Sequence, residues 1–263
     1  MAPNKTLESL AGAMLDLTLY SILACAAALL AGGWVKGMLG VGLPMVAIPL
    51  MASFVPLREA IAIMYGPVLV TNLYQAFQGG FFLTAIKRFW PMMLAVVLGT
   101  WFGSKALVSI DPRWLGGIVG ATVAAFSLVN LINPTLRVPE RHTLWISLVI
   151  GITGGFFGGL TLFIGPAVIM FLVALKVPKE EFIGTIGLIY LLGMVPTGVF
   201  YVIEDTLRLE HVWPTLLACI PVILGMAIGT MIRGHINETL FRKLLLITLV
   251  VIGLNMIRKA MFV

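Results

Sequence analysis

Long charge-free runs of apolar residues make up most of the chain, with short polar segments between them. The runs cover residues 17–35, 37–57, 60–86, 89–104, 114–136, 143–175, 182–203, 212–232 and 244–257. A helix that crosses a bilayer needs about 20 apolar residues, so most runs predict one spanning helix each. At about 1.5 Å per residue, the run 143–175 is too long for one straight crossing, and it predicts a helix that breaks, tilts strongly or doubles back.

The composition indicates that this chain folds in lipid rather than in water. Hydrophobic residues make up 60% of it and charged residues 11%. Soluble domains are about 45–50% apolar and about 25% charged. We therefore predict an all-α polytopic membrane protein, with the lipid bilayer as its surroundings.

One unit of the sequence occurs twice. A shift of 122 residues superposes Gly32-Gly33-Trp34 on Gly154-Gly155-Phe156 and Pro44 on Pro166, and a shift of 126 superposes Gly99 on Gly225. The pattern predicts about eight transmembrane helices in two duplicated four-helix halves, with the first helix of each half broken at Gly and Pro. The expected divisions are an N-terminal segment 1–16, a first transmembrane repeat 17–132, a linker 133–142 and a second transmembrane repeat 143–263.

The relative direction of the halves stays open at this stage. If each broken segment crosses the membrane once, the halves are parallel; if it doubles back, they are inverted. Lys and Arg are spread so evenly over the loops that the positive-inside rule does not decide between these arrangements or fix the orientation.

The two predicted breaks are candidate ligand sites. Gly40, Gly42 and Pro44 interrupt the first long segment, and Gly165 and Pro166 interrupt the second. A break creates a helix N-terminus with free N–H groups and a positive dipole end, where an anion binds. Matching breaks in the halves of a transporter indicate its midplane site. The alternative is that these glycines only permit close helix packing.

Polar side chains near the breaks add candidate contacts. Asn72 and Gln75, with Thr71 and Gln78, fall on one face of the span 60–79, which suits either a cavity or contacts between helices. Lys36 precedes the first break. It is either a buried counter-charge for an anion, or it lies at a hairpin tip and extends its side chain to the headgroups. Thr161 lies at the second break. A third set, on one face of the span 182–203, consists of Tyr190, Met194, Thr197 and Tyr201. We expect these side chains to pack between helices.

The chemistry that the sequence lacks also narrows the function. No His, Asp or Glu lies in the middle of a span, and no metal-binding, nucleotide-binding or catalytic motif is present. The basic residues flank the spans singly or in pairs, which is typical of membrane proteins and not of nucleic-acid binding. We therefore expect no enzyme activity, no cofactor, no metal and no nucleic-acid partner.

Without a visible proton relay, efflux of an anion is the favoured transport mode. An inside-negative membrane expels an anion, with about 2.3 kcal/mol per charge at about 100 mV. The alternatives are ion-coupled uptake of an anion or organic acid, a non-transporting membrane assembly subunit, and an intramembrane enzyme.

Two stretches resemble the TauE/SafE sulfite exporter family. Gly165 to Phe182 reads GPAVIMFLVALKVPKEEF and is similar to the family's second-half signature, in which a proline follows the G-P pair at the interval seen between Pro166 and Pro178. The stretch 40–50 resembles the family's first-half glycine stretch followed by V-P-L. The chain departs from the family's glycines at 42–44, which read Gly-Leu-Pro, and at 163–164, which read Phe-Ile.

The resemblance implies a secondary transporter in the bacterial cytoplasmic (inner) membrane. It implies export of a small sulfur-containing anion such as sulfite, sulfoacetate or a related organosulfonate. The expected substrate contacts are Lys36, Gly40, Gly42, Pro44, Asn72, Gln75, Thr161, Gly165 and Pro166. The oligomeric state stays open.

Overall fold

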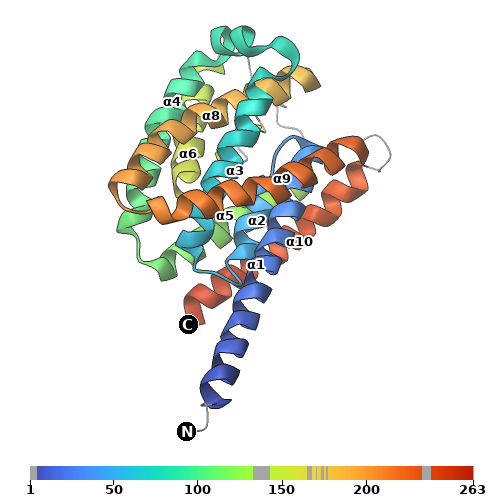
Figure 1. The fold of residues 1–263 in the computed structure, drawn as a ribbon. Helices are drawn as coiled ribbons and strands as arrows, with labels where there is room; N and C mark the ends of the chain where they lie inside the picture. Colours follow the sequence, from blue (N-terminus) through green and yellow to red (C-terminus); the bar gives the residue numbers. More distant parts are fainter. Residues whose placement is uncertain are drawn as a thin grey trace.

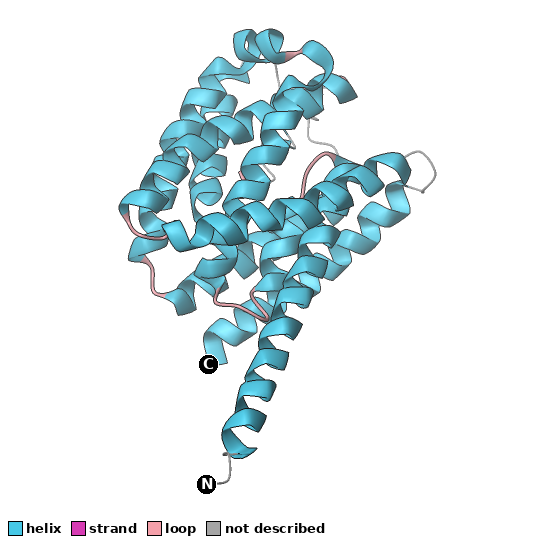
Figure 2. Cartoon of the chain, viewed as in Figure 1, coloured by secondary structure: helices cyan, strands magenta, loops and turns pink. Residues whose placement is uncertain are grey.

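The computed structural model consists of helices joined by short loops, with no strand in the part of the chain that it describes, as Figure 2 shows. The described residues are 5–132, 143–164, 168–169, 171–172, 175, 177–232 and 238–262. The prediction of an all-α protein is confirmed.

The helices of the first half are α1 (Lys5–Leu39), α2 (Leu43–Met51), α3 (Leu57–Phe77), η1 (Gln78–Gly80), α4 (Phe82–Ser109) and α5 (Pro112–Ile132). Those of the second half are α6 (Thr143–Thr161), α8 (Lys179–Ile203), η3 (Leu209–His211), α9 (Val212–Ile232) and α10 (Glu238–Phe262). In Figure 1 the N-terminal part of α1 projects beyond the other helices, on the same side as the C-terminus.

Six helical segments of the described chain are long and apolar enough to cross a membrane. They are Leu19–Leu39, Leu57–Gly80, Phe82–Leu107, Thr143–Thr161, Glu181–Ile203 and Leu209–Ile232. The apolar parts of α5 and α10 are shorter, so the predicted count of eight spans is not confirmed. Large apolar side chains on α9, among them Leu217, Ile220 and Leu224, are more than half exposed, as expected of a surface covered by lipid.

The helix ends repeat at the interval that the sequence predicts. α1 ends at Leu39 and α6 at Thr161, while α3 begins at Leu57 and α8 at Lys179, so both pairs lie 122 residues apart. The long run 143–175 therefore breaks just past its middle, after Thr161, and the first helix of each half ends where the breaks were expected. The exact repeat boundaries stay a prediction, and the linker 133–142 lies outside the described residues.

Both broken segments double back. Tyr20 in α1 and Phe54 after α2 place their rings 5.8 Å apart, so the chain returns to the level at which it entered. A Cβ on Gly32 would lie 2.9 Å from Cβ of Ala47, which places α2 against α1. In the second half, a Cβ on Gly154 of α6 would lie 3.1 Å from Cγ2 of Val168, so the chain after Thr161 returns along α6. Each half thus begins with a helical hairpin.

The two halves have opposite directions. Tyr65 near the start of α3 donates a hydrogen bond to the Met194 carbonyl near the end of α8, and Gln75 near the end of α3 contacts Gly187 near the start of α8. The equivalent helices α3 and α8 are therefore antiparallel. Since α5 and α10 also pair antiparallel, with Gly117 against Ala260 and Gly120 against Gly253, the repeats are inverted.

Glycines let helices of different halves approach closely. A Cβ on Gly225 of α9 would lie 2.9 Å from the backbone nitrogen of Trp34 in α1. A Cβ on Gly155 of α6 would lie 3.0 Å from the backbone nitrogen of Thr100 in α4. The same arrangement occurs twice: α1 of the first half packs along α9 of the second, and α6 of the second half packs along α4 of the first.

Two acid–base pairs join the halves at opposite ends of the bundle. His211 Nε2 lies 2.8 Å from Glu59 Oε2 at the start of α3, and Arg88 Nη1 lies 3.0 Å from Glu181 Oε1 at the start of α8. Glu59 and Glu181 are also 122 residues apart. These carboxylates lie in the first turns of repeat-equivalent helices and are engaged in pairs.

Candidate functional site

Lys36 is a buried cation in the last turn of α1. It is 3% exposed, and its Nζ donates a hydrogen bond to Asn72 Oδ1 of α3 at 2.5 Å. No carboxylate in the described part of the chain forms an ion pair with it. A buried charge without a counter-charge is costly, so an anion bound beside Lys36 would offset that cost.

The burial of Lys36 decides between the two sequence interpretations of this residue. A lysine that reached the headgroups would expose its ammonium group. Here the side chain instead turns into the bundle and meets an amide on a helix of the same half. The hairpin of α1 and α2 thus delivers a cation to the interior.

A side-chain hydrogen bond from Gln75 connects α3 to the break that follows α1. Its Nε2 donates a hydrogen bond to the Gly40 carbonyl at 2.9 Å, and the side chain is 2% exposed. Gly40 has φ 81°, a left-handed conformation that glycine adopts without strain. Because Gly40 N–H also bonds the Lys36 carbonyl, the cation and the break form one unit held against α3.

Two polar atoms of this unit have no protein partner in the described structure. They are Asn72 Nδ2, a donor, and Gln75 Oε1, an acceptor, and each is fully buried. Both amide orientations follow from chemistry, because an ammonium group needs the Asn72 oxygen and a backbone carbonyl needs the Gln75 nitrogen. Buried polar groups are nearly always satisfied, so these two atoms are candidate contacts for a water molecule or a ligand.

Thr71, on the same face of α3, is not part of this set. Its hydroxyl donates to the Pro67 carbonyl within its own helix. The polar face predicted for 60–79 therefore divides into an internally satisfied hydroxyl and two amides that meet the hairpin.

Pro44 and Thr161 come together from different halves. They line a small cavity between α2 and α5, with the apolar side chains of Met45, Ile48 and Phe163 around it. Its volume of about 10 Å³ has room for roughly one water molecule. The Thr161 hydroxyl donates to the Phe157 carbonyl and accepts from the Phe163 N–H.

Gly42 caps the N-terminus of α2 with φ 101°, and Pro44 lies in the first turn. The break thus produces the helix N-terminus that the sequence predicts, three residues after Gly40. Gly165 and Pro166 lie outside the described residues.

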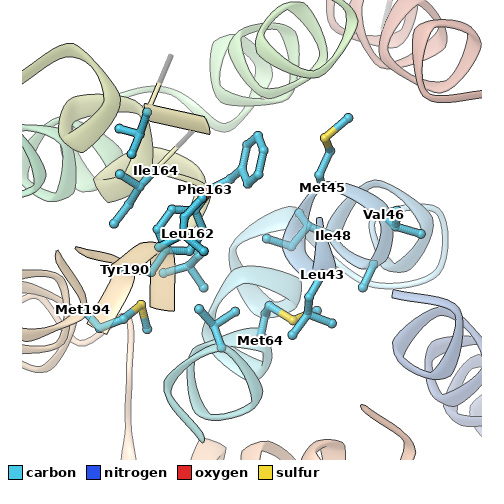
Figure 3. Packing of buried hydrophobic residues seen from close by; sticks show 14 of the residues in the cluster. Leu43, Met45, Val46, Ile48, Met64, Leu162, Phe163, Ile164, Tyr190 and Met194 are labelled. Atoms are coloured by element: carbon cyan, nitrogen blue, oxygen red, sulfur yellow. The ribbon is translucent and has the colours of Figure 1, made fainter. Parts of the chain in front are cut away.

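Among the described residues, the second hairpin carries no matching polar set. The residues equivalent to Lys36, Asn72 and Gln75 are Gly158, Met194 and Thr197. In Figure 3, Leu162 and Phe163 after α6 gather with Ile48 of α2 and Tyr190 of α8 in an apolar cluster. The fold is repeated, whereas in the described part of the chain the buried lysine and the unpartnered amides lie in the first half.

Sequence reasoning missed the polar contacts of α8. Ser104 Oγ of α4 donates to Thr197 Oγ1 at 3.2 Å, and Tyr201 OH donates to the Gly159 carbonyl. The Tyr190 hydroxyl has no partner in the described structure. The shared face of these residues was the available signal, and most of its polar groups join helices.

The described residues contain no group of three or more His, Cys, Asp or Glu side chains placed to hold a metal ion. The buried charged and imidazole side chains of the described residues are Lys36, Glu181 and His211, and the other buried polar side chains are carboxamides and hydroxyls.

Comparison with known proteins gives one match. A family model described as "Sulfite exporter TauE/SafE" matches residues 24–256, which is most of the chain. No curated protein and no solved structure matches.

Proposed function

The chain belongs to the TauE/SafE sulfite exporter family, a family of membrane transporters, and on this premise we propose that it exports a small sulfur-containing anion across the bacterial cytoplasmic membrane. The substrates proposed are sulfite, sulfoacetate or a related organosulfonate. The observation that carries the proposal is the buried ammonium group of Lys36, whose partner is neutral Asn72 and not a carboxylate.

The charge of this site supports an anionic substrate. One ammonium group in a water-poor interior attracts one negative charge far more strongly than it does in water. Asn72 Nδ2 supplies a further hydrogen-bond donor beside it. The substrate contacts proposed are Lys36, Gly40, Asn72 and Gln75, with Gly42 and Pro44 positioning the helix N-terminus that follows.

The inverted hairpins support a carrier mechanism. In transporters with inverted repeats, one repeat rocks against the other around a fixed midplane site. Here the close contacts of α1 with α9 and of α4 with α6 join the halves along glycine faces. The small side chains at these faces let the helices shift with little side-chain rearrangement, and Thr161 with Gly165 and Pro166 would form the second hairpin tip.

The position of the carboxylates supports export. Glu59 and Glu181 are engaged with His211 and Arg88 at helix starts. An inside-negative potential expels an anion without a coupled cation, at about 2.3 kcal/mol per charge and about 100 mV.

Flux from proteoliposomes tests the proposal. Vesicles loaded with sulfite, and separately with sulfoacetate, receive a potassium and valinomycin potential of either sign. Export predicts release that rises when the interior is negative and is absent from protein-free vesicles. Flux that requires a sodium or proton gradient would establish ion-coupled uptake instead, and no flux of either anion through folded protein would favour an assembly subunit.

A further inference from the structure

The hydrogen-bonding atoms at the Lys36 site have a defined complement. They comprise one cation, one unpartnered donor at Asn72 Nδ2 and one unpartnered acceptor at Gln75 Oε1. The two amides are three residues apart on α3, so they are neighbours on one helix face. Lys36 and Gly40 occupy the facing turn of the hairpin.

The unpartnered acceptor, Gln75 Oε1, distinguishes an anion that carries a hydrogen from one that does not. A fully deprotonated oxyanion has only acceptor oxygens, so it leaves Gln75 Oε1 unsatisfied and places two like partial charges together. An anion that carries one hydrogen can satisfy Lys36 and Asn72 with its oxygens and donate to Gln75. A buried acceptor left without a donor costs free energy, and sites built for a donor reject analogues that lack it.

The charge of the site favours the same form of the substrate as its hydrogen-bonding atoms do. Lys36 is the only cationic side chain that the described contacts bring to this site, and a dianion would leave one negative charge buried without compensation. A monoanion leaves none. The repeat-equivalent residues Gly158 and Met194 offer no second charge or amide.

We infer that the site selects a monoanion with one hydrogen-bond donor over a dianion or a donor-free monoanion. In the case of sulfite, the selected form is hydrogen sulfite. Gln75 is the residue that accepts the hydrogen bond from this donor. The inference rests on the proposed function and narrows its substrates to hydrogen sulfite, because sulfoacetate is a donor-free dianion at neutral pH and a simple organosulfonate is a donor-free monoanion. Gln75 holds the hairpin through Nε2 and accepts a hydrogen bond from the substrate through Oε1.

Methanesulfonate is the matched probe, because it has the charge and nearly the size of hydrogen sulfite but no donor. Fluxes of sulfite and methanesulfonate are measured in separate proteoliposomes at one pH below the second ionisation of sulfurous acid, with protein-free vesicles as background. The expected selectivity for sulfite is about tenfold, equivalent to about 1.4 kcal/mol.

Two variants separate the acceptor from the fold. Gln75→Met removes the acceptor and also the hydrogen bond to the Gly40 carbonyl, so the readout is the ratio of sulfite to methanesulfonate flux and not the absolute flux, and this ratio is expected to fall to about one. Gln78→Met removes an amide one turn away, outside the site, and the tenfold ratio is expected to persist. A ratio near one in the natural protein, or an unchanged ratio in Gln75→Met, overturns the inference while leaving anion transport intact. Absence of flux for both anions overturns the proposed function as well.

Discussion

Lys36 Nζ lies 2.5 Å from Asn72 Oδ1, and the two side chains are 3% and 0% exposed. A neutral amide satisfies one of the three ammonium donors but cannot balance the charge. This pair makes the α1–α2 hairpin the charged element of the interior, and the predictions below follow from it and from the backbone that positions it.

Replacing Lys36 by Met removes the charge at similar length. Sulfite flux is expected to fall at least about tenfold, because a hydrogen bond to a charged group contributes about 1.5–3 kcal/mol. The melting temperature without ligand should not fall, since a buried uncompensated charge is removed. Flux and thermal unfolding of the purified protein test this, and wild-type flux in the variant would contradict the site.

Asn72→Asp gives Lys36 a carboxylate partner within the protein. The internal ion pair competes with the substrate, so flux is expected to fall at least about tenfold. The melting temperature is expected to rise by about 2 °C or more, because about 1 kcal/mol corresponds to about 2–4 °C in a chain of this length. Gln78→Glu is the control with the same charge change at the end of α3. Equal effects of both substitutions would show that the effect is not specific to Lys36.

Gly40→Ala tests the left-handed turn. Alanine at φ 81° is strained by about 1–2 kcal/mol, and its Cβ would lie 3.3 Å from Cγ1 of Ile183. Gly80→Ala has similar strain at φ 77° and meets nothing within 4 Å. Both variants should lose stability, and only Gly40→Ala should also lose flux, since Gly40 holds Gln75. Loss of flux in both would mean that strain alone accounts for it.

Gly225→Val tests the interface between α9 and α1. The added side chain would meet the Trp34 backbone, and overpacking costs about 1–3 kcal/mol. Gly116→Val in α5 is the control, because a Cβ there meets nothing within 4 Å. Folded yield and melting temperature should fall for Gly225→Val only. Equal yields for the two variants would contradict the close contact of the halves.

Local patterns predicted much of the fold. The Gly and Pro positions predicted where α1 and α6 end. The 122-residue repeat predicted that a helix boundary in one half recurs at the equivalent residue of the other. Asn72 and Gln75 were recognised because they share a face of one helix. These features depend on residues close together in the sequence.

The remaining features depend on contacts between distant segments. Whether the broken segments cross or double back is decided by packing such as Gly32 on Ala47 and Gly154 on Val168, which no local period contains. The burial of Lys36 follows from that packing. Likewise, Pro44 and Thr161 share a cavity only because hairpins from opposite halves meet.

Titration calorimetry of sulfite into the detergent-solubilised protein tests the central claim most directly. Since the described residues show one such lysine, with the two unpartnered amide atoms of α3 beside its hairpin, the predicted stoichiometry is one anion per chain, with no measurable binding to Lys36→Met. Two anions per chain, or wild-type binding by Lys36→Met, would contradict a single site formed by Lys36, Asn72 and Gln75.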